Sequence, residues 1–209
     1  MRIGLLGGTF DPVHVGHLAL ARSAIEALRL DRVILLPSGR PWQKPELRTP
    51  GGHRLAMVRL AIAGDARLSV DDLELRREGR TYTIDTLIAL RHALGTHCAL
   101  VLLLGSDQLH NLASWHRWHE LLDHAHLAVT QRERVPLSGL PAEVEALLAT
   151  HGRDALPDTP AGSIVLFRMP PVPVSATALR AQLAASARPD GLVPPAVLDY
   201  IDRHRLYGN

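Results

Sequence analysis

Two histidines, His14 and His17, stand three residues apart in the run GGTFDPVHVGH, which covers residues 7–17. This spacing places both imidazoles on the same side of one helical turn. Paired imidazoles can donate hydrogen bonds to phosphoryl oxygens while negative charge builds up there. The free N–H groups and the positive dipole end of a helix start favour the same kind of ligand. The run therefore predicts a site for an anion that is transferred or released.

Glycines precede these histidines and also separate them. Gly7 and Gly8 let the backbone approach a ligand closely and adopt unusual dihedral angles, and Gly16 leaves room for a phosphate or a ring. One alternative is a plain strand–turn–helix joint with incidental histidines. A zinc pair is another, but no third zinc ligand is evident nearby.

A second candidate anion site lies far along the chain, in the run VSATALR over residues 174–180. Ser175 follows a proline-rich break and is a natural helix N-cap. Thr177 falls in the first turn of that helix, and Arg180 lies one turn later on the same side. Two hydroxyls, free N–H groups and a guanidinium suit a triphosphate. An ordinary capped helix that contains an arginine is the alternative.

Three stretches between the two runs could bind a second ligand. A helix is expected to start at Thr83, where its N–H groups could take a carboxylate, although an ordinary helix cap explains the same residues. Asp107 follows Gly105 at the end of the most apolar strand and could accept hydrogen bonds from a ribose or a base amine. Trp115 offers a face on which a flat ring could stack, with core packing as the alternative.

These residues need elements that bring them together, and the apolar pattern predicts a Rossmann-like, doubly wound α/β fold. Short apolar runs alternate with segments of helical spacing, which indicates a parallel sheet covered by helices on both faces. The expected strands cover residues 3–6, 32–36, 68–70, 99–104, 126–130 and 163–167. The expected helices cover residues 18–28, 53–63, 83–94, 176–184 and 195–203. In such a sheet, ligands bind beyond the carboxyl ends of the strands, where the strand order reverses.

A single domain over residues 1–209 is the simplest organisation for a chain of this length. The segment 136–162 is rich in Pro, Gly and Ala and is interpreted as a variable surface excursion that could hold a short helix near 143–148. The apolar fraction is 46% and the net charge is +2, without a basic run, so no nucleic-acid partner is expected. No window approaches a membrane span, and the apolar start is too short for a signal peptide. Cys98 is the only cysteine, which favours a cytoplasmic protein.

Residues 7–17 resemble the GTFDPxHxGH signature of the nucleotidyltransferase family that contains the HxGH element. Residues 174–180 resemble that family's [IV]-S-[AS]-T-x-[IL]-R motif, which holds the β- and γ-phosphates. The stretches 79–87, 104–107 and 114–118 are similar to segments of the bacterial nicotinate-nucleotide adenylyltransferases, and this similarity covers nearly the whole chain. The resemblance implies transfer of the adenylyl group of ATP to nicotinic acid mononucleotide. The products would be nicotinic acid adenine dinucleotide and pyrophosphate, in NAD biosynthesis.

The resemblance also implies roles for individual residues. Those that would stabilise the reacting phosphates are His14, His17, Lys44 and Arg180. Those that would bind ATP are Gly8, Thr9, Phe10, His14, Gly16, His17, Gly105, Asp107, Ser175, Thr177 and Arg180. Those that would bind the nicotinate nucleotide are Lys44, Tyr82, Thr83 and Trp115. Mg²⁺ would arrive with the ATP phosphates, and no protein side chain is expected to ligate it.

Two departures from the family pattern concern the acceptor. Trp42 and Gln43 replace a proline and a histidine before Lys44, the only lysine in the chain, which puts the shape of that loop in doubt. Thr81 replaces a common serine. Three rivals remain at this point. They are a sibling enzyme that acts on nicotinamide mononucleotide or another phosphate acceptor, a non-catalytic nucleotide-binding protein, and an RNA-binding relative. The sequence leaves the oligomeric state open.

Two other groups of polar residues are not expected to form functional sites. The histidines at positions 116, 119, 124 and 126 could suggest a metal cluster, but the predicted elements give no reason for them to converge. Arg76 and Arg77 are expected to lie on a solvated face.

Overall fold

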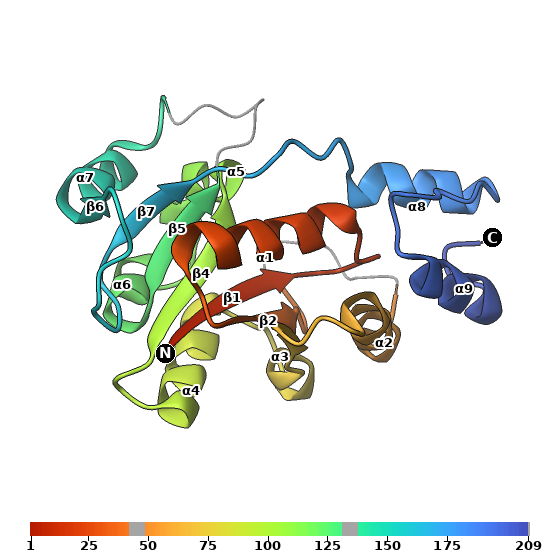
Figure 1. Cartoon of the computed structure of the whole chain (residues 1–209), viewed down its shortest axis with the longest axis horizontal. Coiled ribbons are helices and arrows are strands. Elements are labelled where there is room, and N and C mark those ends of the chain that lie inside the picture. The colour runs from red at the N-terminus through yellow and green to blue at the C-terminus, as the bar shows by residue number, and fades with distance from the viewer. Residues whose placement is uncertain (42–48, 131–137, 209) are drawn as a thin grey trace.

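The computed structural model describes residues 1–41, 49–130 and 138–208. Within these residues, seven parallel strands form one sheet in the order β3-β2-β1-β4-β5-β7-β6. Figure 1 shows this sheet at the centre of the molecule, with helices around it. Its strands are β1 (Arg2–Gly8), β2 (Arg32–Pro37), β3 (Leu68–Val70), β4 (Ala99–Gly105), β5 (His126–Thr130), β6 (Gly152–Arg153) and β7 (Ile164–Phe167). Six of them, all except β6, correspond to the strands predicted from the sequence.

Helices cover both faces of this sheet. One face carries α1 (Val15–Leu28), α2 (Gly51–Ile62), α8 (Ala176–Ala184) and α9 (Pro195–His204). The other carries α3 (Leu73–Arg76), α4 (Thr83–Leu94), α5 (Ser106–His110), α6 (Leu121–His124) and α7 (Ala142–His151), with the 3-10 turns η1 (Leu112–Ser114) and η2 (Trp118–Glu120). The predicted Rossmann-like α/β architecture is therefore confirmed.

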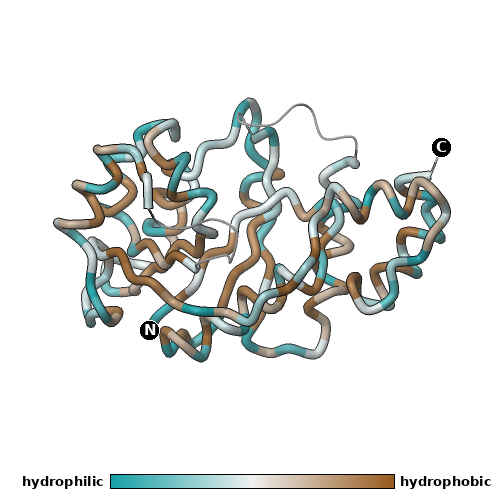
Figure 2. Tube along the Cα trace, turned by 90° about the horizontal axis from the view of Figure 1, so that it is seen from above, coloured by the Kyte–Doolittle hydropathy of each residue, from teal (hydrophilic) through white to brown (hydrophobic). Residues whose placement is uncertain are grey.

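The side chains of β4 explain why this strand is apolar throughout. Successive residues of a strand point to opposite faces of the sheet. Leu100 and Leu102 belong to the apolar core on the α4 side, whereas Val101 and Leu103 belong to the core on the α1 side. Because both faces are covered, no position in this strand can be polar without burying an unsatisfied group. Figure 2 shows the resulting concentration of hydrophobic residues along the central strands.

The strand order reverses between β1 and β4. The chain runs from β1 outward to β2 and β3, and then returns to the other side of β1 to form β4 and β5. The loop after β1 leads to α1 on one face, and β4 leads directly into α5 on the other face. Connections that diverge in this way leave a crevice at the carboxyl ends of the strands.

The structure differs from the sequence prediction mainly in short elements. Helix α1 begins at Val15, three residues before the predicted start, because His14 already acts as its N-cap. The short elements α3, α5, α6, η1, η2 and β6 are absent from the prediction. Helical segments of three to five residues span little more than one turn and show no periodicity, and β6 has only two residues.

The segment 136–162 is more than a surface excursion. Helix α7 lies within it and extends the short helix expected there. Leu140 and Val144 are buried in the core on the α4 side, and β6 pairs with β7. Residues 136 and 137 lie outside the described part of the chain.

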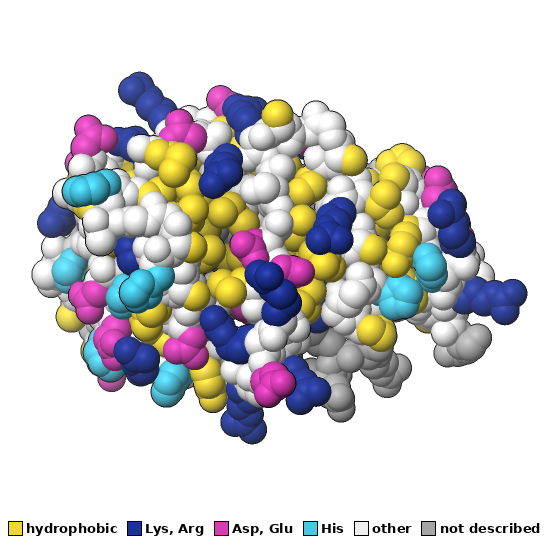
Figure 3. Space-filling view, turned by 90° about the horizontal axis from the view of Figure 1, so that it is seen from below, with side chains coloured by type: hydrophobic (Ala, Val, Ile, Leu, Met, Phe, Trp, Pro, Cys, Tyr) yellow, Lys and Arg dark blue, Asp and Glu magenta, His cyan; other side chains and the backbone are white. Residues whose placement is uncertain are grey.

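On the face shown in Figure 3, arginines and acidic residues are interspersed. Among the helices of the described residues, none is long and apolar enough to cross a membrane.

Candidate active site

A cleft of about 500 Å³ lies at the carboxyl ends of β1, β2 and β4, where the strand order reverses. The predicted site residues that line it are Gly8, Thr9, His17, Thr83, Gly105, Asp107 and Trp115. They come from four separate parts of the sequence. The fold therefore brings residues predicted for ATP and residues predicted for the acceptor to one cleft.

The imidazole rings of His14 and His17 stack on each other. Their centroids are 3.7 Å apart and their planes differ by 21°. The backbone N–H of His14 donates to Nδ1 of His17 at 3.3 Å. Because Nδ1 accepts this hydrogen bond, a neutral His17 carries its proton on Nε2, which is then a donor. His14 is buried and His17 is half-buried at the lining of the cleft.

The unusual backbone conformation of the first loop falls on Phe10. Its φ is 48°, in the left-handed region, whereas Gly7 and Gly8 do not have positive φ. The expectation of unusual dihedral angles at these two glycines is therefore wrong. A Cβ on Gly8 would lie 3.1 Å from the buried Phe10 ring, so a larger residue there would require the ring to shift. A Cβ on Gly7 would meet nothing within 4 Å, so the backbone there is open to the cleft.

Gly16 is a point of contact between the two sequence runs. A Cβ at this position would lie 2.8 Å from Cγ1 of Val174 and 3.1 Å from the His14 ring. The space beside Gly16, which the sequence analysis assigned to a phosphate or a ring, is filled by these two side chains. Gly16 thus allows the start of α1 to pack against the segment that precedes α8.

The start of α8 has the predicted capping geometry. The Ser175 hydroxyl accepts a hydrogen bond from the N–H of Ala178 at 3.2 Å. Arg180 donates from Nη2 to the Thr177 hydroxyl at 3.3 Å and from Nη1 to the carbonyl of Asp11 at 2.8 Å. Ser175, Thr177 and Arg180 lie outside the described lining of the cleft. Of the three, Arg180 reaches the first loop, through the carbonyl of Asp11.

Asp11 is also held from the end of the chain. The Tyr207 hydroxyl donates to Oδ1 of Asp11 at 2.6 Å, and the Asp11 side chain is buried. Burial and the neighbouring Asp11 charge raise the pKa of Tyr207, so its hydroxyl remains a donor. The sequence analysis did not identify this contact, because nothing in the two local patterns links positions 196 residues apart.

The acceptor half of the cleft contains the predicted helix start. Thr83 is the first residue of α4 and Tyr82 is its N-cap, so the N–H groups of the first turn have no partner within the helix itself. The Tyr82 ring packs against His116, with centroids 4.4 Å apart. Trp115 lines the cleft, and its buried Nε1 has no hydrogen-bond acceptor among the described residues.

Glu74 lies at the same cleft and was missed in the sequence analysis. Its Oε1 accepts a hydrogen bond from the Thr86 hydroxyl at 2.9 Å, and Arg77 donates to that hydroxyl at 3.2 Å. Burial raises the pKa of Glu74, opposed mainly by the Thr86 hydrogen bond and the Arg77 charge. Arg77 is half-buried and therefore not part of a solvated face, whereas Arg76 is exposed as expected. Thr86 could have been identified, since it stands three residues after Thr83 on the same side of a predicted helix.

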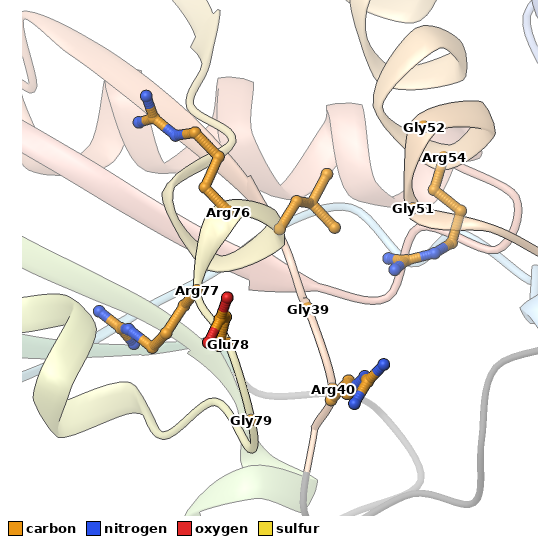
Figure 4. A pocket seen from close by; sticks show the side chains of 10 residues that line it. Gly39, Arg40, Gly51, Gly52, Arg54, Arg76, Arg77, Glu78 and Gly79 are labelled. Atoms are coloured by element: carbon orange, nitrogen blue, oxygen red, sulfur yellow. The ribbon is translucent and has the colours of Figure 1, made fainter.

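A second hollow, of about 730 Å³, lies beside Gly39 and the start of α2. Figure 4 shows that the guanidinium groups of Arg54, Arg76 and Arg77 point in different directions there. Arg76 is ion-paired to Asp72 at 3.0 Å. These cations do not converge on a shared point, and the hollow does not contain the predicted histidines or Trp115. The cleft at the strand ends is therefore the candidate active site.

The other residues considered in the sequence analysis lie outside the described residues or away from the cleft. Lys44, Trp42 and Gln43 lie outside the described residues. His126 uses both ring nitrogens for the fold: Nε2 donates to the carbonyl of Thr159 at 2.7 Å, and Nδ1 accepts from the N–H of Ser163 at 3.2 Å. Among the described residues, no group of three or more His, Cys, Asp or Glu side chains could hold a metal ion.

Comparisons with known proteins show the family to which this chain belongs and its fold. Residues 5–182 match the family model described as cytidylyltransferase-like. A probable nicotinate-nucleotide adenylyltransferase of Bordetella petrii is 47% identical over 99% of this chain and 98% of its own length. A protein of Chromobacterium violaceum with the same name is also 47% identical, with the same coverage. The nicotinic acid mononucleotide adenylyltransferase of Plasmodium falciparum, solved in complex with NaAD, has the same fold, with a TM-score of 0.75 at 18% identity over 99% of this chain and 97% of that one. The chain therefore belongs to the nicotinate-nucleotide adenylyltransferase family, within the cytidylyltransferase-like proteins.

Proposed function

We propose that this chain, as one nucleotidyltransferase domain over residues 1–209, transfers the adenylyl group of ATP to nicotinic acid mononucleotide in NAD biosynthesis. The products are nicotinic acid adenine dinucleotide and pyrophosphate. Membership of the family supports this activity. The observation that carries it is the single cleft that His17, Thr83, Asp107 and Trp115 all line. A cytoplasmic location fits the buried, unpaired Cys98.

The reaction needs no covalent intermediate on the protein. An oxygen of the acceptor's 5′-phosphate is already ionised and attacks the α-phosphorus of ATP. A new O–P bond forms, and the bond from the α-phosphorus to the bridging oxygen breaks. Pyrophosphate leaves with that electron pair. Because the nucleophile needs no activation, catalysis consists of positioning and of stabilising negative charge.

The paired histidines and the start of α8 would bind the phosphates. His17 would donate from Nε2 to the α-phosphoryl oxygens or to the leaving group, since its Nδ1 is occupied by the N–H of His14. Arg180 would neutralise the β- and γ-phosphates together with the hydroxyls of Ser175 and Thr177. Its present contact with Asp11 keeps it beside the first loop. The other ATP contacts proposed for the loops are those of Gly8, Thr9, Phe10 and Gly16. Gly16 would use its main chain, because Val174 and His14 fill the space on its Cβ side.

The acceptor would occupy the α4 side of the cleft. Its carboxylate would accept hydrogen bonds from N–H groups at Tyr82 and Thr83, with the positive end of the α4 dipole behind them. Its pyridine ring would stack on Trp115. Asp107, two residues after Gly105, would accept hydrogen bonds from a ribose hydroxyl or a base amine. Lys44 would pair with phosphate.

Mg²⁺ would enter the cleft with ATP. Such an ion usually keeps several waters and is held largely by substrate phosphates. The described carboxylates of the cleft, Glu74 and Asp107, do not form a cluster that could hold a metal by itself, which fits an ion delivered by the nucleotide. When bound, the ion neutralises part of the phosphate charge.

The proposal is tested by following products from ATP, Mg²⁺ and one candidate acceptor at a time. Nicotinic acid mononucleotide should yield equal amounts of pyrophosphate and nicotinic acid adenine dinucleotide. Reactions without an acceptor, or with pantetheine phosphate, should yield neither a dinucleotide nor pyrophosphate above background. Pyrophosphate release that depends on another acceptor and not on the nicotinate nucleotide would refute the assignment.

A further inference from the structure

Arg54 is the largest fully buried side chain among the described residues, with 2% of its surface exposed. It lies in the first turn of α2, on the same buried stripe as Met57 and Val58. An arginine on an apolar stripe requires an explanation, because burial of a cation is costly unless it is hydrogen-bonded and paired.

The hydrogen bonds of Arg54 all go to the backbone. Nη1 donates to the carbonyl of Thr9 at 2.8 Å and Nη2 to the carbonyl of Ser38 at 2.7 Å. Nε donates to the carbonyl of Thr49 at 3.2 Å. The guanidinium thus joins the loop after β1, the loop after β2 and the segment that leads into α2.

These acceptors satisfy the N–H groups of Arg54 but do not neutralise its charge. Among the described residues, no carboxylate forms an ion pair with Arg54 within 4.0 Å. Burial lowers the pKa of Arg54, and the more distant charges of Asp11 and Glu74 only oppose this shift. The described part of the chain, residues 1–41, 49–130 and 138–208, therefore gives this buried cation no close counter-charge.

The location of this cation links it to the candidate active site. Thr9 and Ser38 both line the cleft. They directly follow neighbouring strands, which end at the paired positions Gly8 and Pro37. The carbonyl of Thr9 also shares its peptide group with the N–H of Phe10, so a charged donor on that oxygen strengthens this N–H as a donor to phosphate.

We propose that Arg54 is a positioning residue whose missing counter-charge is the bound polyphosphate. Its guanidinium group holds the two loops at the ends of β1 and β2 in place. Its positive charge lowers the electrostatic cost of binding a polyanion at these loops. The inference rests on the proposed function for its effect on turnover. Its effect on ATP binding does not require that the acceptor be known.

Three variants distinguish the effect of the guanidinium hydrogen bonds, the effect of the positive charge and a merely structural role. Arg54→Met removes both the charge and the guanidinium hydrogen bonds, whereas Arg54→Lys keeps the charge and loses the planar guanidinium that makes them. Arg91→Met is the matched control. Arg91 of α4 also donates to backbone carbonyls, those of Gly95, Cys98, His124 and Pro160, but it lies next to the amino ends of β4 and β5.

Calorimetric titration with Mg²⁺-ATP, without acceptor, gives the dissociation constant for each variant, and thermal unfolding gives its stability. Arg54→Met should weaken ATP binding by about tenfold or more, because a buried positive charge near the phosphates is lost. Arg54→Lys should stay within about threefold of the wild type in ATP binding, since its charge remains, but should lose about tenfold or more in kcat because the loops are no longer fixed. Arg91→Met should lower thermal stability while ATP binding stays within about threefold.

Unchanged ATP binding in a folded Arg54→Met protein would overturn the proposal, and so would an equal loss in Arg91→Met. If Arg54→Met does not fold, Arg54→Lys decides the matter: kcat and ATP affinity both at the wild-type level would contradict the positioning role. Failure of the wild type to make the dinucleotide would refute the proposed function. It would leave the ATP-binding comparison intact, so the two failures can be distinguished.

Discussion

The Tyr207 hydroxyl donates a hydrogen bond to Oδ1 of Asp11 at 2.6 Å and so ties the end of the chain to the loop that precedes His14. Arg180 binds the main-chain carbonyl of the same aspartate at 2.8 Å. Asp11 is therefore a residue at which the first loop, α8 and the C-terminal segment meet. This connection explains how parts of the chain that are far apart in sequence can hold one set of phosphate-binding groups.

Tyr207→Phe should lower both stability and turnover. The variant keeps the ring but leaves the buried Asp11 carboxylate without this donor, and loss of a hydrogen bond to a charged group costs about 1.5–3 kcal/mol. We expect the free energy of unfolding to fall by that amount, and kcat to fall with it as the loop loosens. Denaturant unfolding and steady-state kinetics measure both. The control is Tyr200→Phe. Tyr200 lies on α9, its hydroxyl forms a hydrogen bond with His53, and loss of that hydroxyl should change kcat little. Equal effects of the two substitutions would argue against a specific role for Asp11.

His17→Ala should lower kcat by about 10²–10⁴, as for the loss of a preorganised donor to the transition state. ATP affinity should change far less, because the other phosphate contacts remain. His119→Ala removes an exposed imidazole elsewhere on the same molecule and should leave kcat at the wild-type level. A His17→Ala protein that keeps more than about a tenth of wild-type turnover would show that the assigned role is wrong.

Arg180→Lys should raise the KM for ATP by about tenfold, since lysine keeps the charge but cannot bind Asp11, Thr177 and a phosphate with one planar fork. The measurement is initial velocity against ATP concentration at saturating acceptor. Circular dichroism and thermal unfolding establish that the variant is folded. Wild-type ATP kinetics in that folded variant would place Arg180 outside the site.

His126 should make the protein sensitive to mild acid. Burial lowers its pKa in the folded state below the usual 6.5, and a proton on Nδ1 would face the N–H of Ser163. The unfolded chain therefore binds a proton at this position below about pH 6.5 and the folded chain does not, so stability is lost as the pH falls from 6.5. His126→Asn keeps a donor and an acceptor but does not titrate. Its free energy of unfolding should depend on pH less steeply than that of the wild type, by up to about 1.4 kcal/mol per pH unit. If the free energy of unfolding of the two proteins depended equally on pH, His126 would not be the source of the acid sensitivity.

The parts of the structure that follow from local patterns could be predicted from the sequence. Strand β4 is apolar on both faces, and the Ser175 cap follows a proline-rich break. The convergence of His17, Thr83 and Asp107 follows from the general rule that ligands bind at the carboxyl ends of parallel strands.

Other features depend on contacts that no local pattern encodes. The hydrogen bond from Tyr207 to Asp11 joins residues 196 positions apart. The left-handed conformation falls on Phe10, a residue type that does not favour it, and not on the neighbouring glycines. Arg54 did leave a signal, because it stands three and four residues before Met57 and Val58 on the buried stripe of α2. A charged residue on an apolar stripe indicates a specific buried role, although the sequence does not say which carbonyl groups it binds.

The preference for nicotinic acid mononucleotide over nicotinamide mononucleotide as the acceptor tests the central assignment most directly. The carboxylate of nicotinic acid mononucleotide would meet the N–H groups at the start of α4, whereas the amide form would present an NH₂ donor to the same donors. Losing a charge-assisted hydrogen bond and leaving a buried donor unpaired costs about 2–4 kcal/mol, or roughly 30- to 1,000-fold in kcat/KM. The measurement is kcat/KM for both mononucleotides at saturating ATP, followed by dinucleotide formation. We expect the acid to be preferred by at least about 30-fold. Comparable values for the two acceptors would contradict nicotinate specificity.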